Sequence, residues 1–239
     1  MSFASYNGLS KAFPHSIRLT RGLTNKLTKL GDYASVLSRV KPSCYATPTR
    51  FKLSVRHFSF CWGGRKLDEI VKLDLLMGKE QNEVELIWKE YHKGLTNTVG
   101  SVLSGEDGMK VLSRAQECSF FVQPIFREGG FFTLVSQFQS PSYFLLAYLE
   151  DYKSDASTSQ PLIAISVYND LASTKHITLI RGEVINKGIL LEEGEKVIHQ
   201  LIEAYRDDHQ FYAHVRTFNK KPSNFNYNDF MEQQRLKWT

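Results

Sequence analysis

Two short runs of aromatic and β-branched residues, joined by adjacent glycines, most strongly constrain how this chain folds. The sequence FFVQPIF occupies residues 120–126 and FFTLVSQF occupies residues 131–138, with Gly129 and Gly130 between them. Runs of this kind favour β-strands. Two successive glycines supply the positive φ angles that tight hairpin turns require. The segment therefore predicts an antiparallel β-hairpin.

A phosphate-binding loop is the alternative interpretation of the two glycines, and their context argues against it. Such a loop opens a helix, because the free N–H groups of the first helical turn bind the anion. Here strand-forming residues follow Gly130 directly. Neither a GxxxxGKS/T motif nor a GxGxxG motif occurs in the chain. The glycines are therefore expected to turn the chain and to bind no phosphate.

Helical periodicity is predicted on both sides of a strand-rich middle. In the helix that Asn82 would cap, the apolar residues Val84, Ile87, Trp88 and Tyr91 recur at helical spacing. Helices are expected at 67–77, 82–91, 109–115, 192–206 and 211–218, and after a capping box at Asp229 and Glu232. Further strands are expected at 142–148, where a helix fits equally well, and at 162–168 and 177–184. Loops are expected at 94–108, 152–160 and 169–174.

This order of elements predicts an α+β fold, with a largely antiparallel, curved sheet flanked by N-terminal and C-terminal helices. Phe131 and Phe132 are consecutive on a predicted strand, so their side chains point to opposite faces of the sheet. The same holds for Phe120 and Phe121. Either helices cover both faces, or one aromatic row is partly exposed and forms a partner-binding patch.

Basic residues are concentrated at the N-terminal end of the chain. The first 66 residues hold twelve Lys and Arg but one acid, Asp32, for a net charge of +11, whereas the remaining residues carry a net charge of −6. A nucleic-acid groove needs clustered cations on the folded surface. The distribution therefore argues against a nucleic-acid partner.

The basic leader is typical of a mitochondrial transit peptide, since it is rich in Arg, Ser and Thr, nearly free of acids, and locally amphipathic. The motif Arg56-His57-Phe58-Ser59 resembles a processing site with arginine at position −3, which predicts cleavage after Phe58. We expect residues 1–58 to be a disordered transit peptide and residues 59–239 to form a single domain. The alternative is a disordered basic tail that binds RNA or acidic lipid.

No motif predicts catalysis, a cofactor or a metal. The spacings of Cys44, Cys61 and Cys118 match neither a zinc site nor a redox pair, so buried free thiols are expected. No common zinc spacing relates His199, His209 and His214. A GxSxG nucleophile motif is absent, and no apolar run approaches the 18 residues of a membrane span. The sequence therefore predicts no catalytic, cofactor-binding or metal-binding residue and no membrane insertion.

Six segments resemble, in the same order, the assembly-factor family of the catalytic F1 sector of mitochondrial ATP synthase, the chaperone of its β subunit. These segments are LDEIVKLDLL, EVELIWKEYH, FFVQPIFREGGFFTLVSQFQ, YLEDYK, PLIAISVYNDLASTKHITLIRGE and FYAHVRTFNKKPSNF. The resemblance runs from Leu67 to about Phe230. It implies a cofactor-free matrix protein, expected to be a monomer, that is no enzyme and no subunit of the finished complex. It further implies that the protein holds the unassembled β subunit and prevents its aggregation until the α subunit replaces it.

The resemblance also implies which residues matter. Among the matching positions, Arg127, Gln137 and Arg181 are polar residues at or next to strand ends, and they are the predicted contacts with the β subunit. The alternatives for each are a solvated strand-end residue or a hydrogen bond at the edge of the core. Four other matching positions are expected to be structural: Trp88, Tyr91, Pro124 and Gly130.

A competing function is that of a small mitochondrial hydrolase or transferase whose curved sheet shelters a ligand. A deep polar pocket, in which histidine and acidic side chains converge, would favour that function.

Overall fold

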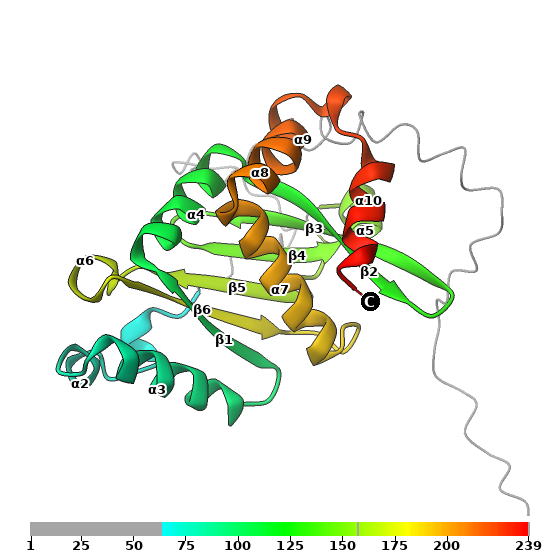
Figure 1. Cartoon of the computed structure of the whole chain (residues 1–239). Coiled ribbons are helices and arrows are strands. Elements are labelled where there is room, and N and C mark those ends of the chain that lie inside the picture. Colours follow the sequence, from blue (N-terminus) through cyan, green and yellow to red (C-terminus); the bar gives the residue numbers. More distant parts are fainter. Residues whose placement is uncertain (1–63, 157, 239) are drawn as a thin grey trace, which may run out of the picture.

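Six antiparallel strands form one curled sheet in the computed structural model, which describes residues 64–156 and 158–238 (Figure 1). Their spatial order is β1-β6-β5-β4-β3-β2. The strands are β1 (Thr98–Ser104), β2 (Phe120–Arg127), β3 (Gly130–Gln139), β4 (Tyr143–Tyr148), β5 (Ile163–Tyr168) and β6 (Ile177–Val184). The predicted α+β class with a largely antiparallel, curved sheet is confirmed. The predicted transit peptide, residues 1–58, lies outside the described residues.

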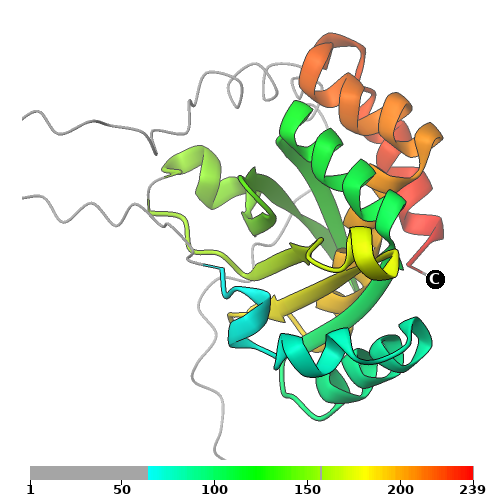
Figure 2. The same ribbon diagram turned by 90° about the vertical axis from the view of Figure 1, so that its left-hand side faces the viewer.

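Helices pack on both faces of this sheet (Figure 2). The helical elements are η2 (Leu67–Glu69), α2 (Leu73–Met77), α3 (Gln81–Lys93), α4 (Gly105–Glu117), α5 (Leu149–Ser154), α6 (Ala172–Lys175), α7 (Leu191–Arg206), α8 (Asp208–Gln210), the π-helical turn η3 (Phe211–Val215), α9 (Arg216–Lys220), η4 (Pro222–Asn224) and α10 (Tyr227–Leu236). We call the face that α4, α7, α9 and α10 cover the α7 face. The opposite face, the α3 face, is covered by α2 and α3 at one end and by α5 at the other.

The core has two parts because the sheet is covered twice. The larger cluster joins the sheet to the helices of the α7 face and extends to the other face at β2, where it includes Phe120 and Val122. A smaller cluster surrounds Trp88 on the α3 face. All six residues of β5 are buried, as expected of a strand with helices on both sides. Phe120 and Phe121 are both buried, although their side chains point to opposite faces. Phe131 and Phe132 are half-buried and pack against the larger cluster.

The predicted hairpin forms β2 and β3, with Arg127 paired to Gly130 and only two residues in the turn. Gly129 has a φ of 87°, whereas Gly130 already belongs to β3 and its φ is not positive. A positive φ at the second turn residue alone is the pattern of a type II turn. One glycine therefore makes the turn, and the second is not required for its backbone geometry.

The structure corrects several boundaries. The predicted loop at 94–108 is wrong, because it contains β1 and the start of α4. The expected helix at 67–77 is interrupted between η2 and α2, and part of the loop expected at 152–160 belongs to α5. Capping also differs: Glu80 caps α3 in place of Asn82, and Asn226 caps α10 in place of Asp229.

The predicted apolar stripe on α3 is wider than the face that the helix buries. Val84, Trp88 and His92 are buried at spacings of four residues. Ile87 and Tyr91, which the periodicity assigned to the core, remain 41% and 42% exposed. The strip facing the sheet is narrow because a short helix lying over a curled edge meets it along one line of side chains.

We expect substitutions at the two glycines of the turn to differ. Gly129→Ala should lower the free energy of unfolding by about 1 kcal/mol, because a Cβ disfavours positive φ. Gly130→Ala should stay within about 0.5 kcal/mol of the parent, since no atom lies within 4 Å of a Cβ built there. Urea unfolding of both variants measures the difference. Equal losses would contradict the assignment of the turn to Gly129.

Candidate functional site

Arg127 lies at the end of β2 and is held by α7. Its Nε and Nη2 atoms donate to the two carboxylate oxygens of Glu193 at 2.5 and 2.7 Å, and Nη2 also donates to the carbonyl of Gly188 at 2.9 Å. The guanidinium stacks 4.8 Å from the centre of the Phe132 ring. The side chain is nevertheless 44% exposed. It is therefore a rigid cation at the surface, already paired with one carboxylate.

Hydrogen bonding and burial shift the pKa values of both Arg127 and Glu193. The hydrogen bond to Glu193 raises the pKa of Arg127. Burial alone raises the pKa of Glu193, but the hydrogen bonds from Arg127 and from the Leu190 N–H outweigh it and leave that pKa below its ordinary value. Both groups are thus charged at neutral pH. The pair connects the hairpin to the first turn of α7.

Arg181 is buried, with only 5% of its surface exposed, and it joins β6 to α3. Its Nη1 lies 3.2 Å from Nε2 of His92, and its Nη2 donates to Glu183 at 2.8 Å. Nδ1 of His92 lies 2.8 Å from the Trp88 carbonyl, which only accepts, so Nδ1 carries the proton and Nε2 accepts from Arg181. His92 is therefore neutral. Burial, followed by the charge of Arg181, lowers its pKa.

Trp88 completes this connection. Its indole Nε1 donates to the carbonyl of Ile180 at 3.0 Å, and its ring centre lies 4.2 Å from that of His92. Two polar contacts, one from each side chain, thus hold α3 against β6. We call Trp88, His92, Arg181 and Glu183 the α3 anchor.

The three predicted contact residues do not form one surface. Gln137 is half-buried on β3, and none of the described residues hydrogen-bonds to its side-chain amide. Cross-strand partners share a face, so the register places Gln137 in one row with Leu145, Ala164 and Glu183. Arg181, two residues from Glu183, lies on that same α3 face. Arg127 instead bonds to α7 on the opposite face.

Reactive groups are not brought together in the described part of the chain. Cys118 is fully buried, and burial raises the pKa of its thiol to about 11. The rings of His209 and His214 are 6.5 Å apart, and His214 is hydrogen-bonded to Gln233. Within residues 64–156 and 158–238, no three His, Cys, Asp or Glu side chains are placed to hold a metal ion. These ranges contain no helix long and apolar enough to cross a membrane.

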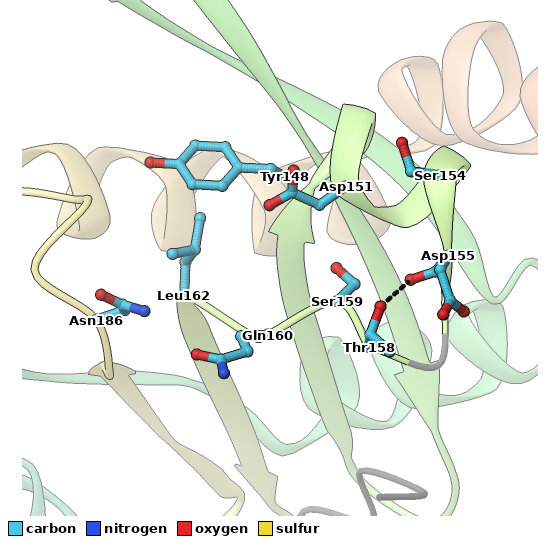
Figure 3. A pocket seen from close by; sticks show the side chains of 9 residues that line it. All are labelled: Tyr148, Asp151, Ser154, Asp155, Thr158, Ser159, Gln160, Leu162 and Asn186. Carbon is cyan, nitrogen blue, oxygen red and sulfur yellow. Dashed lines mark hydrogen bonds between the residues drawn. The ribbon is translucent and has the colours of Figure 1, made fainter. Parts of the chain in front are cut away.

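Two surface cavities in the described part of the chain were compared with a catalytic pocket. A cavity of about 410 Å³ lies between α5, the following loop and Asn186 (Figure 3). Its lining carries the carboxylates of Asp151 and Asp155 but no histidine or cysteine. A second cavity, of about 780 Å³, lies near Tyr143 and Tyr168 and also has no histidine or cysteine in its lining. Neither lining shows the convergence of histidine and acidic side chains that would favour a hydrolase or transferase.

Exposed apolar side chains gather on α2 and α3. Of the eleven large apolar side chains exposed among the described residues, five lie on these two helices. They are Leu75, Met77, Leu86, Ile87 and Tyr91. We call this set the α2–α3 patch. The apolar periodicity of the sequence did not predict this patch. The only sign of it was an apolar stripe on α3 that is broader than the face the helix buries.

Comparison with known families identifies the chain's relatives. A family model described as ATP11 protein matches residues 62–231, which is most of the 239 residues. The chain belongs to this family. The ATP11 family is that of the ATP synthase F1 assembly factors; it is no known enzyme family, and membership implies a mitochondrial location. A search of curated proteins found no match. The resemblance noted in the sequence is thereby confirmed.

The α3 anchor predicts how stability depends on pH. The pKa of His92 lies below its ordinary 6.5 in the folded state, so the unfolded chain binds the proton more readily. The free energy of unfolding should therefore be highest above pH 6.5 and fall as the pH decreases, by at most about 1.4 kcal/mol per pH unit for one proton. Denaturant unfolding between pH 7.5 and 5.5 measures this slope.

His92→Gln should lower stability at pH 7.5 and flatten the slope. His214→Gln is the matched control, because burial also lowers the pKa of that histidine although it lies outside the anchor. His214→Gln should remove only the part of the slope that the titration of His214 contributes. An undiminished slope in His92→Gln would contradict the neutral state assigned to His92.

Proposed function

We propose that this protein binds the unassembled β subunit of ATP synthase in the mitochondrial matrix. By covering that subunit it prevents aggregation, until the α subunit replaces it during assembly of the catalytic sector. Membership in the F1 assembly-factor family supports this proposal. The observation that carries it is the α2–α3 patch, since clustered exposed apolar side chains mark protein-binding surfaces.

The need for such a protein follows from the exposed surface of the unassembled β subunit. A subunit awaiting its neighbour exposes an apolar interface, and exposed apolar surface drives aggregation. A protein that covers this interface needs apolar side chains of its own and no catalytic machinery. The α2–α3 patch, held on a rigid sheet by the α3 anchor, meets this requirement.

The three residues expected at the interface take different parts in this proposal. Arg127 and Gln137 contact the partner through their exposed atoms, Arg127 with its cation and Gln137 with its amide, to which no described residue hydrogen-bonds. Arg181 is buried, so its effect on binding is indirect: it holds His92 in place and thereby fixes the orientation of α3. As Arg127 and Gln137 point to opposite faces, a partner that touches both must reach around the β2–β3 end of the sheet.

Aggregation of the free β subunit tests the proposal. At equimolar ratio, the full chain should suppress light scattering by the purified, unassembled β subunit. Addition of the α subunit should then release the chain and yield α–β complexes on size-exclusion chromatography. If the chain associates with assembled ATP synthase and leaves aggregation of the free β subunit unchanged, the proposal is wrong.

Substitutions in the α2–α3 patch test whether these side chains bind the β subunit. Leu75→Glu combined with Leu86→Glu should weaken capture of the β subunit about tenfold, because loss of apolar anchors and burial of charge oppose association. Both side chains are more than 60% exposed, so the free energy of unfolding should change by about 0.5 kcal/mol or less. Immobilised β subunit measures the binding.

Leu236→Glu is the matched control for this variant. Leu236 is 77% exposed and lies on α10, away from the patch. Capture by this variant should equal that of the parent. Equal loss in both variants would show that added negative charge, and no specific patch, weakens binding.

A further inference from the structure

The two edges of the sheet differ in how well they are protected against pairing with another chain. β2 forms one edge and β1 the other in the described part of the structure. An edge strand presents unpaired N–H and C=O groups, and natural proteins usually cover or interrupt such an edge to prevent unwanted pairing. The two edges therefore show where pairing with another chain is blocked and where it is permitted.

The β2 edge is blocked. The side-chain amide of Asn219 imitates a neighbouring strand, since its Oδ1 accepts from the Phe120 N–H at 3.2 Å and its Nδ2 donates to the Phe120 carbonyl at 2.6 Å. The Ser119 carbonyl accepts from the Phe138 N–H, so by alternation the backbone of Pro124 points outward, like that of Phe120. Proline has no N–H to offer there. Helices α9 and α10 also pack on this strand.

No strand among residues 64–156 and 158–238 pairs with the outer side of β1. The hydrogen bonds from Val184 N–H to the Asn97 carbonyl and from Gly105 N–H to the His176 carbonyl fix the pairing of β1 with β6. In an antiparallel ladder every second residue faces the neighbouring strand. The residues between those then point away from β6 with both backbone groups. They are Thr98, Gly100, Val102 and Ser104, of which Ser104 also caps α4.

Exposure agrees with this geometry. The first six residues of β1 are all half-buried and the seventh is exposed, whereas β5 is buried throughout. Gly100 is informative because it has no side chain, so its exposed surface is that of the main chain. A Cβ on Gly100 would lie 2.6 Å from the His92 ring, so the α3 side of this residue is covered. The ring of His92 itself lies 5.0 Å from the exposed ring of Tyr91.

We propose that the outer edge of β1 binds an extended segment of the unassembled ATP synthase β subunit, which joins the sheet as a seventh strand. This inference rests on the proposed function and names the surface that performs it. Main-chain pairing gives the affinity, and the side chains that alternate along the added strand give the specificity.

The chemistry of the edge fits an extended polypeptide without charged side chains, because β1 offers main-chain groups and no opposite charge. The sequence of β1 is TVGSVLS, which holds no charge and no proline. None of the usual protections of an edge is therefore present in the strand. On the α3 side, Gly100 lies against the His92 ring, which is next to the exposed ring of Tyr91, so the edge adjoins the α2–α3 patch. Interface cores are depleted of charged residues, so a segment that a subunit exposes before its neighbour binds fits this edge.

Amide hydrogen exchange of the full chain, alone and mixed with purified β subunit, tests the proposal residue by residue. In the free chain the amides of Val99, Ser101 and Leu103 should exchange slowly, since they bond to β6. Those of Thr98 and Gly100, with Val102, should exchange fast. In the complex the second group should slow at least about tenfold, so that the alternation disappears.

Each outcome decides between the proposals. If the complex forms and the outward amides stay fast, the seventh strand is wrong and the proposed function stands. If no complex forms with the β subunit, the proposed function fails and the inference falls with it. If these amides are slow in the chain alone, at concentrations where its mass doubles, a second copy occupies the edge and the inference is overturned.

Val102→Pro isolates the main-chain contribution. This change removes one outward N–H, leaves the bonds to β6 in place, and should weaken binding of the β subunit at least about tenfold. Val102→Ala is the matched control, because it loses more of the side chain but keeps the N–H, and its affinity should stay within about threefold. Thermal unfolding verifies that both variants are folded. Equal affinities of the two variants would overturn the proposal.

Discussion

The pairing of β1 with β6 is the interaction on which the rest of the structure depends. It joins the N-terminal helices to a strand that follows most of the sheet in sequence. Once β1 lies beside β6, Trp88 reaches the Ile180 carbonyl and His92 reaches Arg181. Without this pairing the short connection from α3 to β1 would not bring α3 onto β6, and the apolar side chains of α2 and α3 would have no fixed position.

How much of this could be predicted from the sequence follows from how local each signal is. The β2–β3 hairpin was predictable, because strand-forming runs and the turn glycine lie within twenty residues. The strand β1 was not. Its sequence contains glycine and serine, and what makes it a strand is a partner far along the chain. The same reason applies to Arg181, whose sequence position suggested a surface contact although His92 and Glu183 bury it.

The α2–α3 patch and the β1 edge show a common arrangement. Both are features that a protein acting alone would avoid, since each invites association. The chain does avoid them elsewhere: Asn219 and Pro124 block the opposite edge, and the large aromatic side chains of β2 are mostly buried. Selective exposure next to selective protection is what a binding surface requires. The lack of converging reactive groups among the described residues fits this arrangement, since holding a subunit breaks no bond.

The proposed function requires that the β subunit be released without an energy source, and the proposed strand pairing suits this requirement. A net contribution of about 0.5–1.5 kcal/mol for each hydrogen bond gives a few kcal/mol for the outward groups of three residues. The apolar patch adds affinity in proportion to the area that it buries. A subunit that buries a larger, more complementary interface exceeds this sum and displaces the chain by mass action. A short, uncharged edge therefore sets an upper limit on affinity, which keeps the proposed complex reversible.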